Sequence, residues 1–352
     1  MEKVEAIKLL KENPWNVQAG EKYSIDYFKP SDAPGIARLF YSVYGDAYPI
    51  DTCYIPERLV EENRLGNILS AVARTASGDV ISHIALYRSS SPNPNLYECG
   101  LGLTLPAYRS SIAYFRANEL LFKLVGTGPV DGLYAEAVCN HTITQKHSKH
   151  VRAVETAVEP ALMPGKTYEI ENSYDGRVGC IFYFRVDRDC RRTLYLPLPY
   201  INELTTILDG LNLDREILTS SDNFDSGNGG EIEVKRFDFA GVARCTVMSP
   251  GEGIVTQVAA IEQELQNGNY AIIQFFVDLG KPWSGQVVKQ LRQCGFSFGG
   301  LLPIWFGSDG LLMQKHFVDP DFEGMKILTD RGNRLFEMIR GEWERRGEGE
   351  HC

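Results

Sequence analysis

The order of strands and helices between residues 21 and 165 is the feature that most limits what this chain can fold into. Residue patterns predict strands at 23–27, 68–74, 80–87, 96–105, 132–139 and 153–163, and helices at 33–44, 110–125 and 142–150. Asp32 is the expected N-cap of the first of these helices. Three strands follow one another with no helix between them, so antiparallel pairing should dominate a mixed sheet. This order predicts an α+β sandwich and excludes a doubly wound parallel sheet.

The C-terminal half broadly repeats this order of elements. Helices are predicted at 200–211, 254–266 and 284–293, and strands at 232–239, 242–248, 271–278, 298–305 and 311–316. At about 150 residues per domain, 352 residues correspond to two domains. We therefore expect an N-terminal helix and loop at 1–20, a first domain at 21–165, a connector at 166–199, and a second domain at 200–352 that ends in a helix.

Charge and composition exclude several classes of partner. The chain has 36 Lys and Arg against 46 Asp and Glu, a net charge of −10, which repels nucleic-acid backbones and anionic lipid. No apolar run reaches the roughly 18–20 residues of a membrane span, and the first ten residues lack the apolar block of a signal peptide. The eight cysteines form no C-x-x-C pair, which favours reduced thiols in a cytoplasmic protein over disulfides or a zinc ribbon.

Residues 97–113 carry the most specific chemical signal. A predicted strand ends in Pro106-Ala107-Tyr108-Arg109, and a predicted helix begins at once with Ser110 and Ser111. Exposed amides at a helix N-terminus beside an arginine form an anion site. Alternatively, Arg109 is a surface residue and the serines only cap the helix. The run Gly100-Leu101-Gly102 matches no nucleotide-binding motif and predicts a bulge or turn.

This block, together with residues 135–141, resembles the GNAT superfamily of acyl-CoA-dependent N-acyltransferases over roughly residues 21–165. The resemblance implies two GNAT-like α+β sandwiches with mixed, mostly antiparallel sheets, and acetyl-CoA or another acyl-CoA as co-substrate. It further implies that the thioester and the pyrophosphate are held by Leu103, Leu105, Arg109, Ser110, Ser111, Ala113 and Asn140. Ile112 and Tyr114 stand where the family has small residues, and a Cβ there reduces the room for phosphate.

Two residues are candidates for proton transfer. Glu98 lies eleven residues before Arg109, the spacing of the general base in the histone-acetyltransferase branch of the family. A carboxylate there would take the proton from the attacking ammonium. Glu136 on the next strand is the second candidate, and a solvent-facing Glu98 is the alternative interpretation. His147 falls at the position of the family's tyrosine acid, although it is also typical of a polar helix residue.

The histidines at 141, 147 and 150 lie close enough together to raise the question of a metal site. Lys146 and Lys149 are interleaved with them and disfavour a cation. We therefore expect no metal.

The second half lacks several residues that the resemblance requires. Gly295-Phe296 fits a family motif, but Leu291 occupies the tyrosine position. Glu252 stands in the loop where pyrophosphate would bind and would repel it. We expect a degenerate second domain that packs against the first or provides substrate walls.

These observations leave two functions open. One is an N-acyltransferase that moves an acetyl or other acyl group from acyl-CoA to an amine on a small molecule or peptide. The other is a non-catalytic GNAT-like module that senses a ligand or binds a protein. The sequence is compatible with a homodimer and leaves the oligomeric state open.

Overall fold

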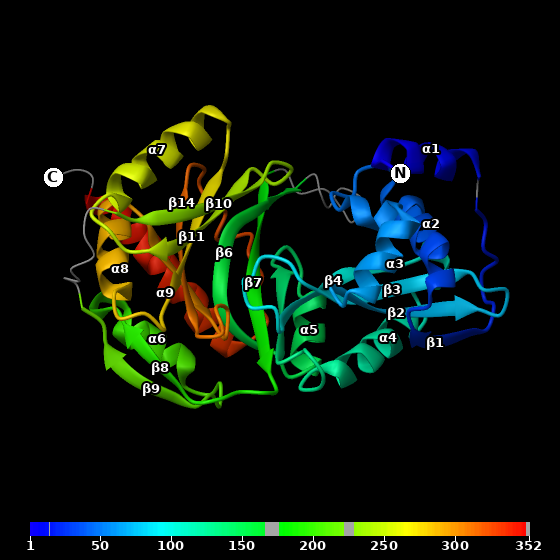
Figure 1. The fold of residues 1–352 in the computed structure, drawn as a ribbon, viewed down its shortest axis with the longest axis horizontal. Helices are drawn as coiled ribbons and strands as arrows, with labels where there is room; N and C mark the ends of the chain where they lie inside the picture. Colours follow the sequence, from blue (N-terminus) through cyan, green and yellow to red (C-terminus); the bar gives the residue numbers. More distant parts are fainter. Residues whose placement is uncertain (14, 166–175, 222–228, 350–352) are drawn as a thin grey trace. The chain divides into compact units, whose positions relative to one another are not determined.

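The computed structural model describes residues 1–13, 15–165, 176–221 and 229–349. The chain divides into two compact units, Met1–Leu133 and Tyr134–Cys352 (Figure 1). The sequence analysis placed its first domain at 21–165, so its last strand and helix fall in the second compact unit. No helix in the described part of the chain is long and apolar enough to cross a membrane.

The first unit is built on four antiparallel strands in the order β1-β2-β3-β4. Their bounds are β1 Tyr23–Tyr27, β2 Ile68–Thr75, β3 Val80–Tyr87 and β4 Leu96–Thr104. The helices are α1 Lys3–Glu12, α2 Ala33–Tyr44, α3 Pro56–Arg64 and α4 Ala113–Leu121.

Helices cover both faces of this sheet. One core joins buried residues of α1, α2 and α3, such as Ile36 and Leu59, to strand residues such as Val72 and Leu101. A smaller core on the other face places Ala113, at the start of α4, against Ile81 and Ala73. The two apolar faces of the sheet are therefore both buried, which is the requirement for a stable three-layer sandwich.

The second unit contains the strand order β5-β7-β6-β13-β14-β12-β11-β10. The strands are β5 Gly132–Val138, which begins at the unit boundary, β6 Val154–Pro164, β7 Arg177–Val186, β10 Glu231–Phe237, β11 Val242–Ser249, β12 Ile272–Asp278, β13 Ser297–Leu302 and β14 Gly310–His316. β11 runs parallel to β12, whereas the pairs β10–β11, β12–β14, β13–β14, β6–β13 and β6–β7 are antiparallel. A separate parallel pair joins β8 Arg192–Leu196 to β9 Arg215–Thr219.

The strand ladder between β6 and β13 has one registered residue pair. Gly300 of β13 pairs with Ala157 of β6, and its φ is +125°. A Cβ at Gly300 would lie 2.4 Å from the Ala157 Cα. Only glycine permits this close approach of the two backbones.

Helices pack on one face of this sheet, as Figure 1 shows for α7, α8 and α9. Their bounds are α5 Ile143–His150, α6 Ile201–Leu208, α7 Ile254–Asn267, α8 Ser284–Gln293 and α9 Asp330–Gly349. The other face carries an aromatic cluster in which the ring of Trp305 contacts those of Tyr134, Phe182, Phe184 and Phe276. Both faces of the sheet are thus largely apolar.

The predicted fold class is confirmed: the chain is α+β with a mixed, mostly antiparallel sheet. Two details differ from the sequence-based predictions. The expected connector supplies β7, which lies between β5 and β6, and also β8. Asp32 makes no side-chain cap of α2; its carboxylate instead accepts bonds from the Lys29 amide and the Arg74 guanidinium. Within the expected connector the sequence also predicts extended runs at 167–170 and 180–186; the second lies in β7, and the first falls outside the described residues.

Candidate functional site

Strand β4 contains a bulge in its middle. His83 pairs with Leu103 and Ala85 pairs with Gly100, so two residues of β4 oppose one residue of β3. Leu101 within this bulge has φ +53°, a conformation that costs a branched side chain free energy. Bulges redirect the backbone and occur preferentially beside active sites. The structure therefore confirms the irregularity that Gly100-Leu101-Gly102 predicts, and places it in the strand that carries Glu98.

His83 holds the bulge in place from the neighbouring strand. Its side chain is fully buried, with Nδ1 2.8 Å from the Leu101 carbonyl oxygen and Nε2 3.0 Å from Ser70 Oγ. A carbonyl oxygen can only accept, so Nδ1 carries the proton and Nε2 accepts from the Ser70 hydroxyl. Burial lowers the pKa of His83 to about 4, which keeps the ring neutral. The sequence analysis did not identify this residue.

Glu98 lies near the start of β4 and is half-buried. The Tyr87 hydroxyl donates a hydrogen bond of 2.5 Å to Glu98 Oε1 from the facing position on β3. This bond fixes the carboxylate, so the alternative of a freely solvated Glu98 does not fit the structure. The neighbouring thiol of Cys99 is also desolvated, since burial raises its pKa to about 12.

Tyrosines surround this part of β4. A Cβ at Gly100 would lie 2.9 Å from the Tyr87 ring, and a Cβ at Gly102 would lie 2.7 Å from the Tyr114 hydroxyl. The two glycines therefore make room for the two aromatic rings. Burial raises the pKa of Tyr114 well above its usual range. Tyr114, which replaces a small residue of the family pattern, thus lies directly against the bulged strand.

The loop after β4 is anchored by the tyrosine of the Pro-x-Tyr-Arg motif. Tyr108 is buried, and its hydroxyl donates to the Gln18 carbonyl at 2.5 Å and accepts from the Glu21 amide at 3.1 Å. Its ring also packs edge-on against Tyr23. Tyr108 therefore has a structural role that fixes the path of the next residues.

The structure begins helix α4 at Ala113, three residues later than predicted. Ser111 and the residues before it form turns in which the Arg109 amide donates to Pro106 and the Ser111 amide donates to Tyr108. Ser111 Oγ accepts from the Ala113 amide at 3.3 Å. Ser111 thus closes a local serine turn just before α4, and the predicted cap is not formed, because the N-cap position is Ile112 and no side chain caps the helix.

Three groups around this loop have no partner among the described residues: the amides of Ser110 and Ile112, and the Arg109 guanidinium. Arg109 and Ser110 are exposed, whereas Ala113 is buried. Unpaired amides beside an exposed cation meet the requirements of an anion site.

The backbone of β4 corrects the predicted thioester contacts. The Leu105 amide donates to the Ile81 carbonyl at 2.8 Å, so it points toward β3. Amide direction alternates along an antiparallel strand, which turns the Leu103 amide the same way and the Thr104 amide toward the opposite edge. Thr104, rather than Leu103 or Leu105, thus has a backbone N–H directed away from β3.

Asn140 and His147 lie in the second compact unit, after β5 and on α5. Burial, followed by the charge of His150, lowers the pKa of His147 to about 4. The ring is therefore neutral near pH 7, which disfavours the predicted role as an acid. Asn140 is half-buried, and its Oδ1 has no hydrogen-bond partner among the described residues.

The predicted second base, Glu136, belongs to a buried network instead. Its carboxylate accepts a 2.8 Å bond from the Arg244 guanidinium, which also donates to Glu159 and Gln274. Glu159 and Gln274 are fully buried. Burial and the charge of Glu136 raise the pKa of Glu159, while Arg244 and Gln274 oppose this effect. These four residues are far apart in sequence, and no local pattern announces their contact.

The second half contains a parallel strand pair, β11 with β12, and a helix that begins shortly after β11. β11 pairs with β12 up to Thr246 and Phe276, and α7 follows β11 after a short loop. The Gly253 amide donates to the Gly229 carbonyl, and the Gln257 side chain donates to the Gly230 carbonyl at 2.8 Å. The chain's own carbonyl therefore occupies the Gly253 amide, which is one of the donors at which an anion would bind. No group of three metal-ligating side chains occurs within the described ranges.

Comparisons with known proteins identify acetyltransferases among solved structures. Matches include the ribosomal-protein-S5-alanine acetyltransferase of Vibrio fischeri, at 13% identity over 50% of this chain and 97% of that one, with a TM-score of 0.38. An N-acetyltransferase of Staphylococcus aureus matches at 14% identity over 47% and 98%, with a TM-score of 0.37. An aminoglycoside 6′-N-acetyltransferase in complex with coenzyme A matches at 13% over 46% and 96%, with a TM-score of 0.34.

Each of these structures corresponds to about half of the present chain. At these identities and scores the likeness carries no conclusion about activity. No protein-family model matches the sequence. No curated protein matches it either.

Proposed function

We propose that this protein is an acyl-CoA-dependent N-acyltransferase whose reacting groups lie on and after β4. The observation that carries the proposal is the bulged strand itself. On one short segment it joins a fixed carboxylate at Glu98, an amide at Thr104 that points away from β3 and the unpaired donors around Arg109. These are the three kinds of group that transfer from a thioester to an amine requires.

Glu98 acts as the general base. An amine is an ammonium at neutral pH and becomes nucleophilic only after it loses a proton. The Glu98 carboxylate takes that proton, directly or through a water, and the Tyr87 hydroxyl holds the carboxylate in position. The amine nitrogen then attacks the thioester carbonyl carbon, and the C–S bond breaks as the amide forms.

The Thr104 amide stabilises the oxygen that becomes negative during this attack, because a fixed N–H donor favours developing charge. The departing thiolate needs little help from an acid, since a thiol of pKa about 8.5 is a good leaving group. The proposal therefore does not depend on His147 or Asn140, whose roles stay predictions.

Arg109 and the amides of Ser110 and Ile112 bind the pyrophosphate of the acyl-CoA. They fit this group because they have unsatisfied donors on an exposed loop that leads into α4. The exposed side chains of Ile112 and Phe115, at 58% and 50%, flank the same helix start and would contact the nucleotide.

The acceptor in this proposal is a cationic amine of a small molecule or peptide. Tyr44, Tyr48 and Phe40 form a ring cluster, and the charge of Glu98 is among the influences that raise the pKa of Tyr48. Aromatic faces beside a carboxylate favour an ammonium. Spermidine and aminoglycosides, which the names of matched acetyltransferases mention, are therefore suitable first acceptors to test.

The test begins with binding of acetyl-CoA by calorimetry. Arg109→Gln should weaken binding about tenfold or more, because it removes a charge-assisted contact. Arg116→Gln, which changes an exposed arginine on α4 that faces Glu119, is the matched control and should bind normally. Lack of acetyl-CoA binding by the unmodified chain would refute the transferase and favour the non-catalytic module.

Turnover of a panel of amines, measured as release of the coenzyme A thiol, tests the role of Glu98 as the base. Glu98→Gln should reduce kcat/KM by about 10²–10⁴, and the loss should shrink at high pH, where the amine is already deprotonated. Glu119→Gln serves as the exposed control. Unchanged turnover in Glu98→Gln would show that another group accepts the proton.

A further inference from the structure

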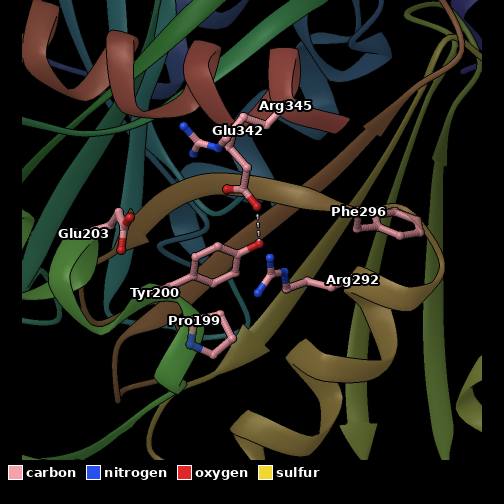
Figure 2. A pocket seen from close by; sticks show the side chains of 7 residues that line it. All are labelled: Pro199, Tyr200, Glu203, Arg292, Phe296, Glu342 and Arg345. Atoms are coloured by element: carbon pink, nitrogen blue, oxygen red, sulfur yellow. Dashed lines mark hydrogen bonds between the residues drawn. The ribbon is translucent and has the colours of Figure 1, made fainter. Parts of the chain in front are cut away.

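A cavity of about 330 Å³ lies in the second unit. It is formed by three elements that are distant in sequence: the start of α6, the end of α8 and the last turns of α9. Figure 2 shows Tyr200 at its centre, with charged side chains arranged around the ring. The volume is at the lower end for small-molecule sites, which suits a ligand much smaller than coenzyme A.

The cavity is lined by two arginines that form no direct ion pair with a described carboxylate. Arg292 from α8 and Arg345 from α9 line it, and neither makes a hydrogen bond or an ion pair with any described residue. The Arg292 guanidinium lies 5.3 Å from the centre of the Tyr200 ring, which holds it at the cavity by a cation–π contact. Two guanidinium groups without a direct ion pair at one cavity favour the binding of a carboxylate or phosphate ligand.

The carboxylate of Glu342 lies between these arginines and acts on both through its charge, but its hydrogen bonds within the described residues go to other groups. Glu342 Oε1 accepts from the Tyr200 hydroxyl at 2.5 Å, drawn as a dashed line in Figure 2, and Oε2 accepts from the Phe298 amide at 3.0 Å. Burial raises the pKa of Glu342. Glu342 is therefore held in a fixed position at the cavity, and its hydrogen bonds connect α9 to Tyr200, just before α6, and to Phe298 of β13.

A second carboxylate is available for a cation. Glu203 projects from α6 on the side of Tyr200 opposite Arg292, as Figure 2 shows. It makes no hydrogen bond or ion pair within the described ranges. Unpaired charges of opposite sign thus face one cavity from different walls, and they are too far apart to pair with each other at 4 Å.

We propose that this cavity binds a small zwitterion, an amino acid or a dipeptide, with its carboxylate on Arg292 and Arg345 and its ammonium on Glu203. Both charges of such a ligand find an unpaired partner, whereas a simple anion leaves Glu203 unpaired beside it. The apolar wall formed by Pro199 and Phe296 accommodates aliphatic parts of the ligand. Because the ligand contacts α6, α8 and α9 together, it stabilises the packing of these three helices. This inference goes beyond the proposed transferase and does not depend on it.

The full chain can be tested by calorimetry and thermal unfolding against the twenty common amino acids and glycylglycine. Propionate, inorganic phosphate and propylamine are the single-charge probes. A zwitterion should bind and raise Tm, and each single-charge probe should bind at least tenfold more weakly. Equal binding of propionate or phosphate would overturn the zwitterion assignment, and no binding by any zwitterion would overturn the site.

Matched variants connect the result to the cavity. Arg345→Gln should weaken zwitterion binding at least tenfold, whereas Arg334→Gln, an exposed arginine on α9 outside the cavity, should not. Glu203→Gln should remove the preference for zwitterions over propionate. Equal effects of the two arginine variants would overturn the proposal, and acetyl-CoA binding measured in parallel distinguishes this outcome from failure of the transferase.

Discussion

The buried imidazole of His83 makes the stability of the first unit depend on pH in a predictable way. Its pKa is about 4 in the folded chain, because burial outweighs the hydrogen bond to Leu101 and the charge of Asp32. In the unfolded chain the ordinary value of 6.5 applies. Between these two values the unfolded chain binds the proton and the folded chain does not. The free energy of unfolding therefore falls as the pH is lowered through this window.

The size of the effect follows from the two pKa values. At about 1.36 kcal/mol per pKa unit, His83 should withdraw about 2 kcal/mol of stability by pH 5 and about 3 kcal/mol by pH 4. Asparagine at this position can still donate toward Leu101 but cannot titrate. His83→Asn should be less stable than the unmodified chain at pH 7, by about 1–3 kcal/mol, because the Ser70 hydroxyl loses its acceptor.

The assay is urea unfolding of the two proteins at several pH values between 7 and 4.5. The difference in stability should shrink as the pH falls, since only the unmodified chain pays the cost of protonation. Ser70→Ala keeps the titrating ring and should retain the steep dependence. If His83→Asn loses stability with acid as steeply as the unmodified chain, His83 is not the neutral, buried support of the β4 bulge that we describe.

Two further predictions concern the second unit. Arg244→Met leaves Glu136 and the buried Glu159 without their cation and should cost about 3–5 kcal/mol of unfolding free energy. The control Arg236→Met breaks an exposed pair with Glu264 and should cost less than about 1 kcal/mol. Equal losses of the two variants in chemical denaturation would contradict the buried network. Gly251→Ala would place a Cβ 1.6 Å from the Gly229 carbonyl oxygen and should lower the free energy of unfolding by about 1–3 kcal/mol. In the control Gly229→Ala the new Cβ meets nothing within 4 Å, and stability should change little. Indistinguishable stabilities of the two variants would show that residue 229 does not pack against Gly251.

Local patterns predicted the elements but not the contacts between distant ones. Helix α2 occupies the predicted range 33–44, and the glycines at 100 and 102 correctly predicted the bulge in β4. Glu98 was placed on the right strand for the same reason, since alternation and spacing are local properties. Which way the Leu105 amide points could not be predicted, because the direction depends on the pairing register with β3.

Contacts between segments that are distant in the sequence could not be predicted from local residue patterns. The residue pattern of β7 is typical of any extended segment. Its position between β5 and β6 depends on which strands pair in the sheet. The Arg244 network and the Tyr200 cavity each join segments more than 80 residues apart. Serine pairs likewise support either a cap or a turn, and at Ser110 and Ser111 the anchoring of Tyr108 selects the turn.

The two helix starts differ in what they offer to the acyl-CoA of the proposed function. At α4 an exposed arginine and two unpaired amides remain available. At α7 the glycines at 229 and 251 allow the chain to fold back so closely that its own carbonyl accepts from the Gly253 amide. An internal acceptor already satisfies that donor, so a phosphate would have to displace packed backbone in order to bind. Because Glu252 adds like charge at the same place, the geometry and the electrostatics both favour a single acyl-CoA per chain, at the bulged strand of the first unit.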